Sequence, residues 1–141
     1  MQGGGPVLPI DENGEMPLLT EQHIVAARQR VRALTQQLKF SLIDQTKLIT
    51  AASELSRNTL VHGKGGRMRW ETVREGAKVG LRLHFEDQGP GIADIKLALT
   101  DGWTSGSGMG LGLPGSKRLV NEFELQSEPG AGTRVSITKW K

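Results

Sequence analysis

The sequence predicts an α+β fold, a two-layer sandwich in which helices cover one face of a mixed, mostly antiparallel sheet. Two patterns predict this class. Apolar residues recur at helical steps of three and four between Ile24 and Leu38. Residues 79–86 alternate between apolar and polar side chains, which is typical of a strand with one buried face. Helices that precede paired strands favour one helical layer on one sheet.

Four helices are expected, at about residues 21–40, 42–62, 93–100 and 114–121. Thr20 and Ser41 stand directly before the first two helices and are good N-cap residues, because their side-chain oxygens accept hydrogen bonds from free backbone N–H groups. Gly63 ends the second helix, since glycine readily adopts the left-handed conformation found after helices. Pro114 suits the first turn of the last helix, where its missing N–H is not needed.

Four strands are expected, at residues 67–74, 79–86, 123–127 and 133–140. A turn at Glu75-Gly76 joins the first pair, and the glycine-containing segment 129–132 joins the second. Residues 1–16 are rich in glycine, proline and acidic residues, so we expect an N-terminal tail with a short edge strand near residues 7–10. Residues 17–141 are expected to form a single domain.

The composition argues against several classes of function. Cysteine is absent, so disulfides and thiolate metal sites are excluded. No apolar run approaches the roughly 20 residues of a membrane-spanning helix, and the first residues do not have the pattern of a secretory signal. We therefore expect a cytoplasmic protein without a membrane partner. A formal net charge of +3 and an aromatic content of 4% give no support for nucleic-acid binding.

Two polar residues of the second expected helix share one face. Glu54 and Asn58 are four residues apart, and His62 lies one turn further along. A carboxylate at this position can accept a proton, and an amide oxygen is a hard ligand suited to Mg²⁺. Taken alone, the pattern is more often an ordinary exposed helix face.

The segment Asp87-Gln88-Gly89-Pro90-Gly91 directly follows the alternating strand. One interpretation is a tight turn with no further role. The other is a binding site, because the strand end fixes the Asp87 carboxylate, which can accept a hydrogen bond from the exocyclic amine of adenine. Glycine at positions 89 and 91 would leave room for a purine ring, since no Cβ projects there.

A dense glycine cluster follows. Six of the 19 glycines fall within fourteen residues, at Gly102, Gly106, Gly108, Gly110, Gly112 and Gly115. Their spacing lets consecutive backbone N–H groups turn toward an anion, and the helix that follows adds its own unpaired N–H groups. The pattern indicates a phosphate cradle. A flexible linker is the alternative, which Leu111 and Leu113 at fixed steps disfavour.

A fourth signal is Gly130-Ala131-Gly132-Thr133, which is a hairpin turn or a site where Thr133 offers its hydroxyl beside whatever Asp87 binds. The four signals occur in the order E-x-x-x-N, D-x-G-x-G, G-x-G-x-G-L and G-T. This order resembles the Bergerat ATP-binding fold, the histidine-kinase-like ATPase type shared by gyrase, Hsp90, histidine kinases and MutL.

Three longer stretches bring the resemblance closer. They are TAASELSRNTLVHG, FEDQGPGIADIKLALTDGW and GLGLPGSKRLVNEFELQSEPGAGTRVSITKW, and they look like the stand-alone RsbT-type serine kinases. Those kinases belong with the anti-sigma-factor kinases of bacterial partner-switching pathways. The resemblance covers residues 17–141 and implies a fold of the Bergerat type.

The resemblance also implies a role for each matching position. Glu54 would be the general base or would position the nucleophile, and Asn58 would coordinate Mg²⁺. The backbone of the second glycine box would hold the phosphates, at Gly108, Gly110, Leu111 and Gly112. Residues 93–109 would form the ATP lid.

The base of the nucleotide is implied to bind at the other signals. Asp87 would hold adenine, in a pocket shaped by Gly89 and Gly91. Thr133 would support adenine through a water molecule.

The activity implied by the resemblance is transfer of the ATP γ-phosphate, with Mg²⁺, to a serine of a STAS-domain antagonist. Members of this type also activate a metal-dependent phosphatase when released, and either a monomer or a homodimer is compatible with the sequence. The chain shows no dimerisation helix with a phospho-acceptor histidine, and His62 is not such an acceptor, so another protein must supply it. Two alternatives stay open: a non-catalytic nucleotide-dependent module that sequesters a sigma factor or phosphatase, and an ATP-hydrolysing fragment of a larger machine.

Overall fold

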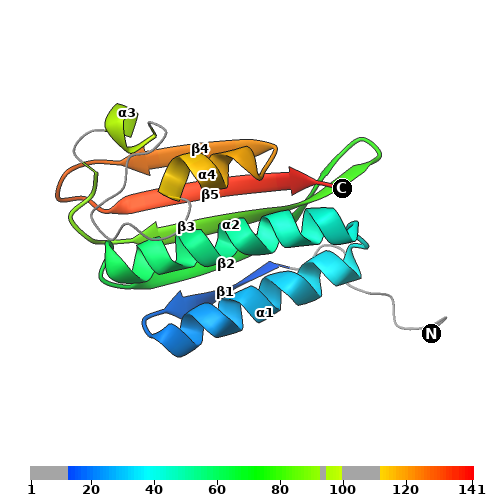
Figure 1. Cartoon of the computed structure of the whole chain (residues 1–141), viewed down its shortest axis with the longest axis horizontal. Helices are drawn as coiled ribbons and strands as arrows, with labels where there is room; N and C mark the ends of the chain where they lie inside the picture. The colour runs from blue at the N-terminus through cyan, green and yellow to red at the C-terminus, as the bar shows by residue number, and fades with distance from the viewer. Residues whose placement is uncertain (1–12, 93–94, 100–111) are drawn as a thin grey trace.

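The computed structural model describes residues 13–92, 95–99 and 112–141. Within these residues five strands form one sheet with the order β1-β2-β3-β5-β4 (Figure 1). The strands are β1 Asn13–Leu18, β2 Gly66–Glu75, β3 Lys78–Asp87, β4 Glu122–Ser127 and β5 Thr133–Trp140. The helices are α1 Glu21–Gln37, α2 Leu42–Val61, α3 Ile95–Ala98 and α4 Gly112–Arg118. The predicted α+β class with a mostly antiparallel sheet is confirmed, and all four strand pairings among the described residues are antiparallel.

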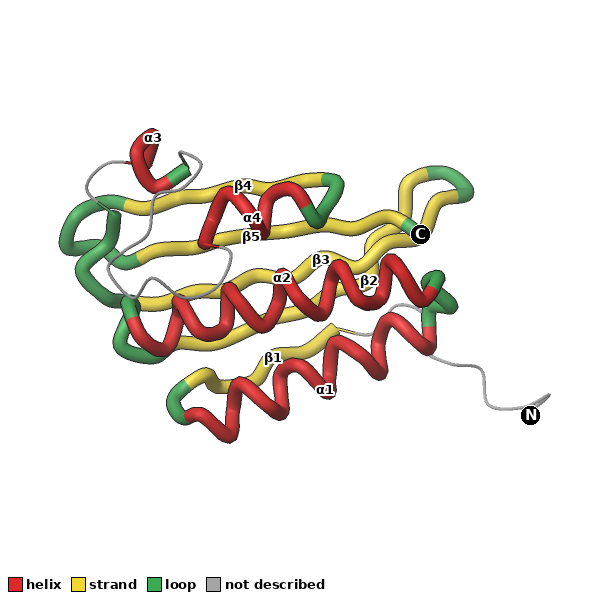
Figure 2. Tube along the Cα trace, viewed as in Figure 1, coloured by secondary structure: helices red, strands yellow, loops and turns green. Residues whose placement is uncertain are grey.

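The two long helices begin where their caps predict. The Thr20 hydroxyl accepts a hydrogen bond from the His23 N–H at 3.2 Å, and the Ser41 hydroxyl accepts one from the Asp44 N–H at 3.1 Å. Lys39, with φ 62°, reverses the chain between the helices, which run antiparallel to each other. Figure 2 shows α1, α2 and α4 on the same face of the sheet.

The first strand is an edge strand that the sequence did not predict at this position. β1 pairs with β2 in antiparallel register, with Leu18 opposite Gly66. Pro17 within the strand is tolerated at an edge, because an edge strand pairs on one side only. The expected strand near residues 7–10 lies outside the described residues, and four residues of the expected tail, 13–16, belong to β1.

The core lies between the sheet and the helices. Leu81, Leu83 and Phe85 of β3 are at most 1% exposed and belong to one cluster with Leu48 and Leu55 of α2. Burial of each such side chain contributes about 1.5–3 kcal/mol to folding. This packing fixes the rotation of α2 about its axis and so decides which of its residues face away from the core. None of the described helices combines the length and apolar character that crossing a membrane requires.

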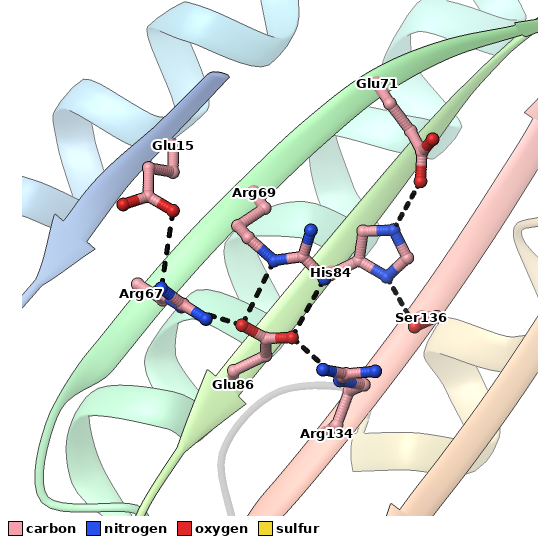
Figure 3. A network of polar contacts seen from close by, with 8 residues as sticks. All are labelled: Glu15, Arg67, Arg69, Glu71, His84, Glu86, Arg134 and Ser136. Atoms are coloured by element: carbon pink, nitrogen blue, oxygen red, sulfur yellow. Dashed lines mark hydrogen bonds and ion pairs between the residues drawn. The ribbon is translucent and has the colours of Figure 1, made fainter. Parts of the chain in front are cut away.

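The opposite face of the sheet is covered by no described helix and carries charged side chains (Figures 1 and 3). Glu86 of β3 is only 8% exposed there. Arg67 and Arg134 each bring Nε to 2.7 Å from its carboxylate, and Arg69 contacts both oxygens at 3.0 and 3.1 Å. We call Glu86 and these three arginines the Glu86 cluster. Alternation along β3 predicts a solvent-facing side chain at this position, and the arginines explain its burial.

Burial alone would raise the pKa of Glu86. Hydrogen bonds from Arg69 and Arg67, together with the charges of Arg69 and Arg134, outweigh burial and lower that pKa to about 2. The Glu86 carboxylate is therefore ionised across the physiological pH range.

Replacing Glu86 with glutamine should change how stability depends on pH. The folded-state pKa of about 2 lies below the usual value of 4.5, so the ionised carboxylate stabilises the fold fully above about pH 5, and this stabilisation is lost as pH falls toward about 2. The loss amounts to about 3 kcal/mol. Urea unfolding of wild type and Glu86→Gln at several pH values between 7 and 2 gives the free energy of unfolding of each. Plotted against pH, the two free energies should converge at low pH. Parallel curves would contradict the assignment.

Candidate active site

The helix α2 and the start of α4 meet at Glu54, the predicted acid. Glu54 and Asn58 are both half-buried and lie one turn apart on a side of α2 that flanks its core residues. The Glu54 Oε2 accepts a hydrogen bond from the backbone N–H of Gly112 at 3.4 Å. Gly112 has φ 69° and is the first residue of α4, which starts two residues earlier and ends three residues earlier than predicted. The acid on α2 thus reaches the end of the glycine-rich segment.

Asn58 lies one helical turn beyond Glu54. Within the part of the chain that the structure describes, its side-chain amide makes no hydrogen bond. The described part of the fold therefore does not use this amide, whose oxygen is available to a ligand there. His62, on the same face, is the C-cap of α2, and its backbone N–H donates to the Asn58 carbonyl at 2.9 Å.

Asp87 is the last residue of β3 and follows Phe85 on the helix-covered face. Its Oδ1 accepts a hydrogen bond from the Gly89 N–H at 2.9 Å. Burial raises the pKa of Asp87, and the backbone N–H groups of Gly89 and Thr133 offset part of that rise. A desolvated carboxylate held only by backbone donors is typical of a functional site, since it keeps acceptor capacity for a ligand.

Glycines let three chain segments approach at Asp87. A Cβ on Gly63 would lie 2.3 Å from the Asp87 Cγ, and a Cβ on Gly89 would lie 2.8 Å from the Gly63 Cα. A Cβ on Gly91 would lie 2.1 Å from the Glu128 carbonyl oxygen, and Gly91 has φ +79°. In the described structure Gly89 and Gly91 are required for this close backbone packing. Their role in shaping a purine pocket stays a prediction. Gly63 was identified from sequence only as a helix stop.

Thr133 lies beside Asp87 in the sheet, and its predicted role next to the ligand of Asp87 stays a prediction. The two residues are opposite each other in the β3–β5 pairing. The Thr133 hydroxyl is 2.8 Å from that of Ser127, which accepts a hydrogen bond from the Ile92 N–H at 2.7 Å. Ser127 therefore ties the turn after Asp87 to β5, a role that no local sequence pattern indicates.

Gly132 also supports Asp87, and it provides a test. A Cβ on Gly132 would lie 2.2 Å from the Asp87 carbonyl oxygen, whereas Gly130 in the same turn has open space around it. Both residues have positive φ, so alanine costs backbone strain at both. Gly132→Ala should lower the free energy of unfolding by about 1–3 kcal/mol more than Gly130→Ala, in urea titrations. Equal losses of unfolding free energy in the two variants would mean that the backbone around Gly132 and Asp87 accommodates the added Cβ at no energetic cost.

The predicted phosphate cradle is only partly described. Gly112 is placed next to Glu54, while Gly108, Gly110 and Leu111 lie outside the described residues. Of the predicted lid, 93–109, the structure describes 95–99, which include the short helix α3.

A cavity of about 1100 Å³ opens at the strand ends. It is lined by the α2–β2 turn and by the ends of β3, β4 and β5, and Asp87 and Thr133 are among its lining residues. Arg67, Glu86 and Arg134 also line it, so it extends toward the open face of the sheet. Glu54 and Asn58 are not part of its lining, and this cavity is therefore not the whole predicted site.

The donors near α2 suit one kind of metal. Among the described residues no group of three or more His, Cys, Asp or Glu side chains could hold a metal ion by itself. Mg²⁺ is usually bound through one or two protein oxygens, with waters and phosphate oxygens in the other positions. An amide oxygen at Asn58 and a carboxylate one turn away at Glu54 fit such a Mg²⁺–nucleotide complex.

The chain is similar to a known protein family and to individual proteins. The family model described as "Histidine kinase-, DNA gyrase B-, and HSP90-like ATPase" matches residues 43–141. The serine/threonine-protein kinase RsbT of Bacillus subtilis is 45% identical over 123 residues, which are 87% of this chain and 92% of that protein. An anti-sigma F factor of Clostridium kluyveri is 32% identical over 119 residues, which are 80% of this chain and 82% of that protein.

A solved structure shows the same fold. The RsbU and RsbW domains of a Mycobacterium tuberculosis protein match with a TM-score of 0.59 at 18% identity. The match covers 91% of this chain and 31% of that chain.

Proposed function

The chain belongs to the family of histidine kinase-, DNA gyrase B- and HSP90-like ATPases, among its RsbT-like serine kinases and anti-sigma factors, and from this premise we propose that it is a protein serine kinase of a partner-switching pathway. The proposed reaction transfers the γ-phosphate of ATP to a serine of a STAS-domain antagonist. The observation that carries the proposal is the contact between the Glu54 carboxylate and the Gly112 N–H. It joins the acid–amide face of α2 to the end of the glycine-rich segment.

The proposed nucleotide site has two ends. Asp87 accepts a hydrogen bond from adenine at the end of β3, and the raised pKa of its carboxyl marks it as the desolvated acceptor. The glycine-rich segment that ends at Gly112 holds the phosphates with its backbone N–H groups. Asn58 binds Mg²⁺, which, when present, neutralises charge on the triphosphate.

Transfer requires mainly positioning, as in phosphoryl transfer generally. The serine oxygen of the acceptor forms a bond to the γ-phosphorus while the bond from that phosphorus to the bridging oxygen breaks. ADP leaves with the electron pair, and the serine proton passes to the Glu54 carboxylate. Glu54 keeps acceptor capacity for this proton, since the Gly112 N–H uses only part of it.

Phosphorylation of the antagonist acts as a switch because it adds negative charge to the interface with the kinase. A phosphoserine adds about −1.5 to −2 charges at neutral pH, enough to break a packed protein interface. The phosphorylated antagonist then releases the kinase. In the same proposal the released kinase binds and activates a metal-dependent phosphatase.

The test is a transfer assay with mapped acceptors. The purified chain is incubated with γ-labelled ATP, Mg²⁺ and the STAS-domain proteins that co-purify with it from its source cells. We expect one labelled STAS protein with phosphate on serine. Steady ATP turnover without a labelled protein would contradict the kinase and favour a hydrolase.

A second candidate has support from the comparisons. Several relatives are named anti-sigma F factor, such as the one of Clostridium kluyveri. A module that sequesters a sigma factor without catalysis would bind ATP and its partner but would label no protein and turn over no ATP.

A further inference from the structure

The Glu86 cluster (Figure 3) lies next to Asp87 and Thr133 in the sequence, and Arg67, Glu86 and Arg134 line the same cavity as those two residues. Glu86 precedes Asp87 in β3, and Arg134 follows Thr133 in β5. The strands pair so that Glu86 is opposite Arg134 and Asp87 is opposite Thr133. Two successive contacts therefore join the same strands. The Glu86–Arg134 ion pair lies on the open face, and the Asp87 carboxylate, whose ionised form the Thr133 N–H favours, lies on the covered face.

The other neighbouring strand is held in the same way. Arg67 of β2 is opposite Glu86, and Gly66 is opposite Asp87. A Cβ on Gly66 would lie 2.0 Å from the Glu86 carbonyl oxygen, so the two backbones approach closely here. Ends of strands open more easily than their centres, because fewer interactions hold them. The cluster concentrates its ion pairs at the end that carries Asp87.

We propose that Glu86 is a positioning residue: with Arg67, Arg69 and Arg134 it fixes the end of β3, so that the Asp87 carboxylate keeps its hydrogen bond from Gly89 and its register opposite Thr133 and faces the base of a bound nucleotide. The consequence for the nucleotide rests on the proposed function. The effect on the hydrogen bonds of Asp87 concerns the chain alone and can be measured without nucleotide.

The same face offers a matched control. Arg82 of β3 and Glu122 of β4 form an ion pair with Nη2 3.5 Å from Oε1. Arg82 lies five residues before Asp87 in β3, and neither partner contacts the Glu86 cluster. Glu122→Gln therefore removes a charge from the same face without touching the end of β3.

The first measurement is amide hydrogen exchange by NMR in nucleotide-free protein. The Gly89 amide reports its hydrogen bond to Asp87, and the Thr133 amide reports the position of β5 opposite Asp87. Each variant's exchange is referred to its own free energy of unfolding from urea titration, so that a general loss of stability is subtracted. We expect about tenfold faster exchange in Glu86→Gln than in Glu122→Gln, which corresponds to about 1.4 kcal/mol. Equal exchange in the two variants would overturn the proposal.

The second measurement is the preference for ATP over GTP, taken from dissociation constants in the presence of Mg²⁺. Glu86→Gln should reduce the preference by about tenfold and Glu122→Gln should leave it unchanged. If wild type shows no preference while the amides respond as expected, the proposed nucleotide function fails and the positioning role of Glu86 stands. If wild type prefers ATP and Glu86→Gln keeps both the preference and slow exchange, the positioning role fails alone.

A milder variant covers the case in which Glu86→Gln does not fold. Arg134→Gln removes only the ion pair between Glu86 and β5, and the Arg134 side chain is 48% exposed. The same two measurements should shift in the same direction by a smaller factor. Unchanged exchange at Thr133, the chain neighbour of Arg134, would overturn the proposal.

Discussion

Asn58→Ala is expected to abolish Mg²⁺–ATP-dependent phosphorylation of the acceptor protein while leaving the fold intact. The amide of Asn58 is half-buried and bonds to none of the described residues, so its removal breaks no hydrogen bond among them. Alanine is also the better helix former at a position inside α2. The loss of a metal ligand should lower the transfer rate by at least about a hundredfold, or about 2.7 kcal/mol of transition-state stabilisation.

The measurement is single-turnover transfer from labelled ATP to the acceptor, with urea unfolding as the stability check. Thr50→Ala is the control, because Thr50 is exposed on the same face of α2, one turn before Glu54. The control should transfer phosphate as wild type does. Retained transfer in Asn58→Ala would remove the metal assignment.

Asp87→Asn is expected to weaken ATP binding by about a hundredfold without a matching loss of stability. Burial raises the pKa of Asp87, which means that its ionised form is disfavoured in the folded protein. Neutral asparagine relieves that penalty at pH 7 and still offers one oxygen to the Gly89 or Thr133 N–H. It presents an amide in place of the charged acceptor that the adenine amine would use.

Binding of a fluorescent ATP analogue, acceptor binding and urea unfolding should be measured on the same Asp87→Asn preparation. The nucleotide affinity should fall more than the affinity for the acceptor protein. Equal losses of nucleotide binding, acceptor binding and stability would point to unfolding. An unchanged nucleotide affinity would contradict the assignment of adenine to Asp87.

The helices could be predicted from sequence because their signals are local. Thr20 and Ser41 cap helices that begin at the next residue, and apolar spacing identifies their buried faces. β1 was missed, since six edge residues that include Pro17 show no clear alternation. Edge strands depend on a partner strand, here β2, and the partner is far away in the sequence.

The site was predictable where a motif shows which residues share a face. Helical spacing predicts that Glu54 and Asn58 share a face, and the resemblance to the family predicts their roles. The supporting residues did not follow, because their contacts join distant segments. Glu86 looks like one more polar residue of an alternating strand until the register places arginines of β2 and β5 around it. Gly63 likewise gains its meaning only when the end of α2 packs on Asp87.

The order of the sheet has a consequence for how the protein is made. β5 comes last among the described strands, yet it lies between β3 and β4. During synthesis from the N-terminus, β3 and β4 each expose an unpaired edge until β5 leaves the ribosome. Unpaired edges invite pairing with other chains, so this interval is when the nascent polypeptide is most prone to aggregate. A chain that stops before Thr133 would keep both open edges permanently.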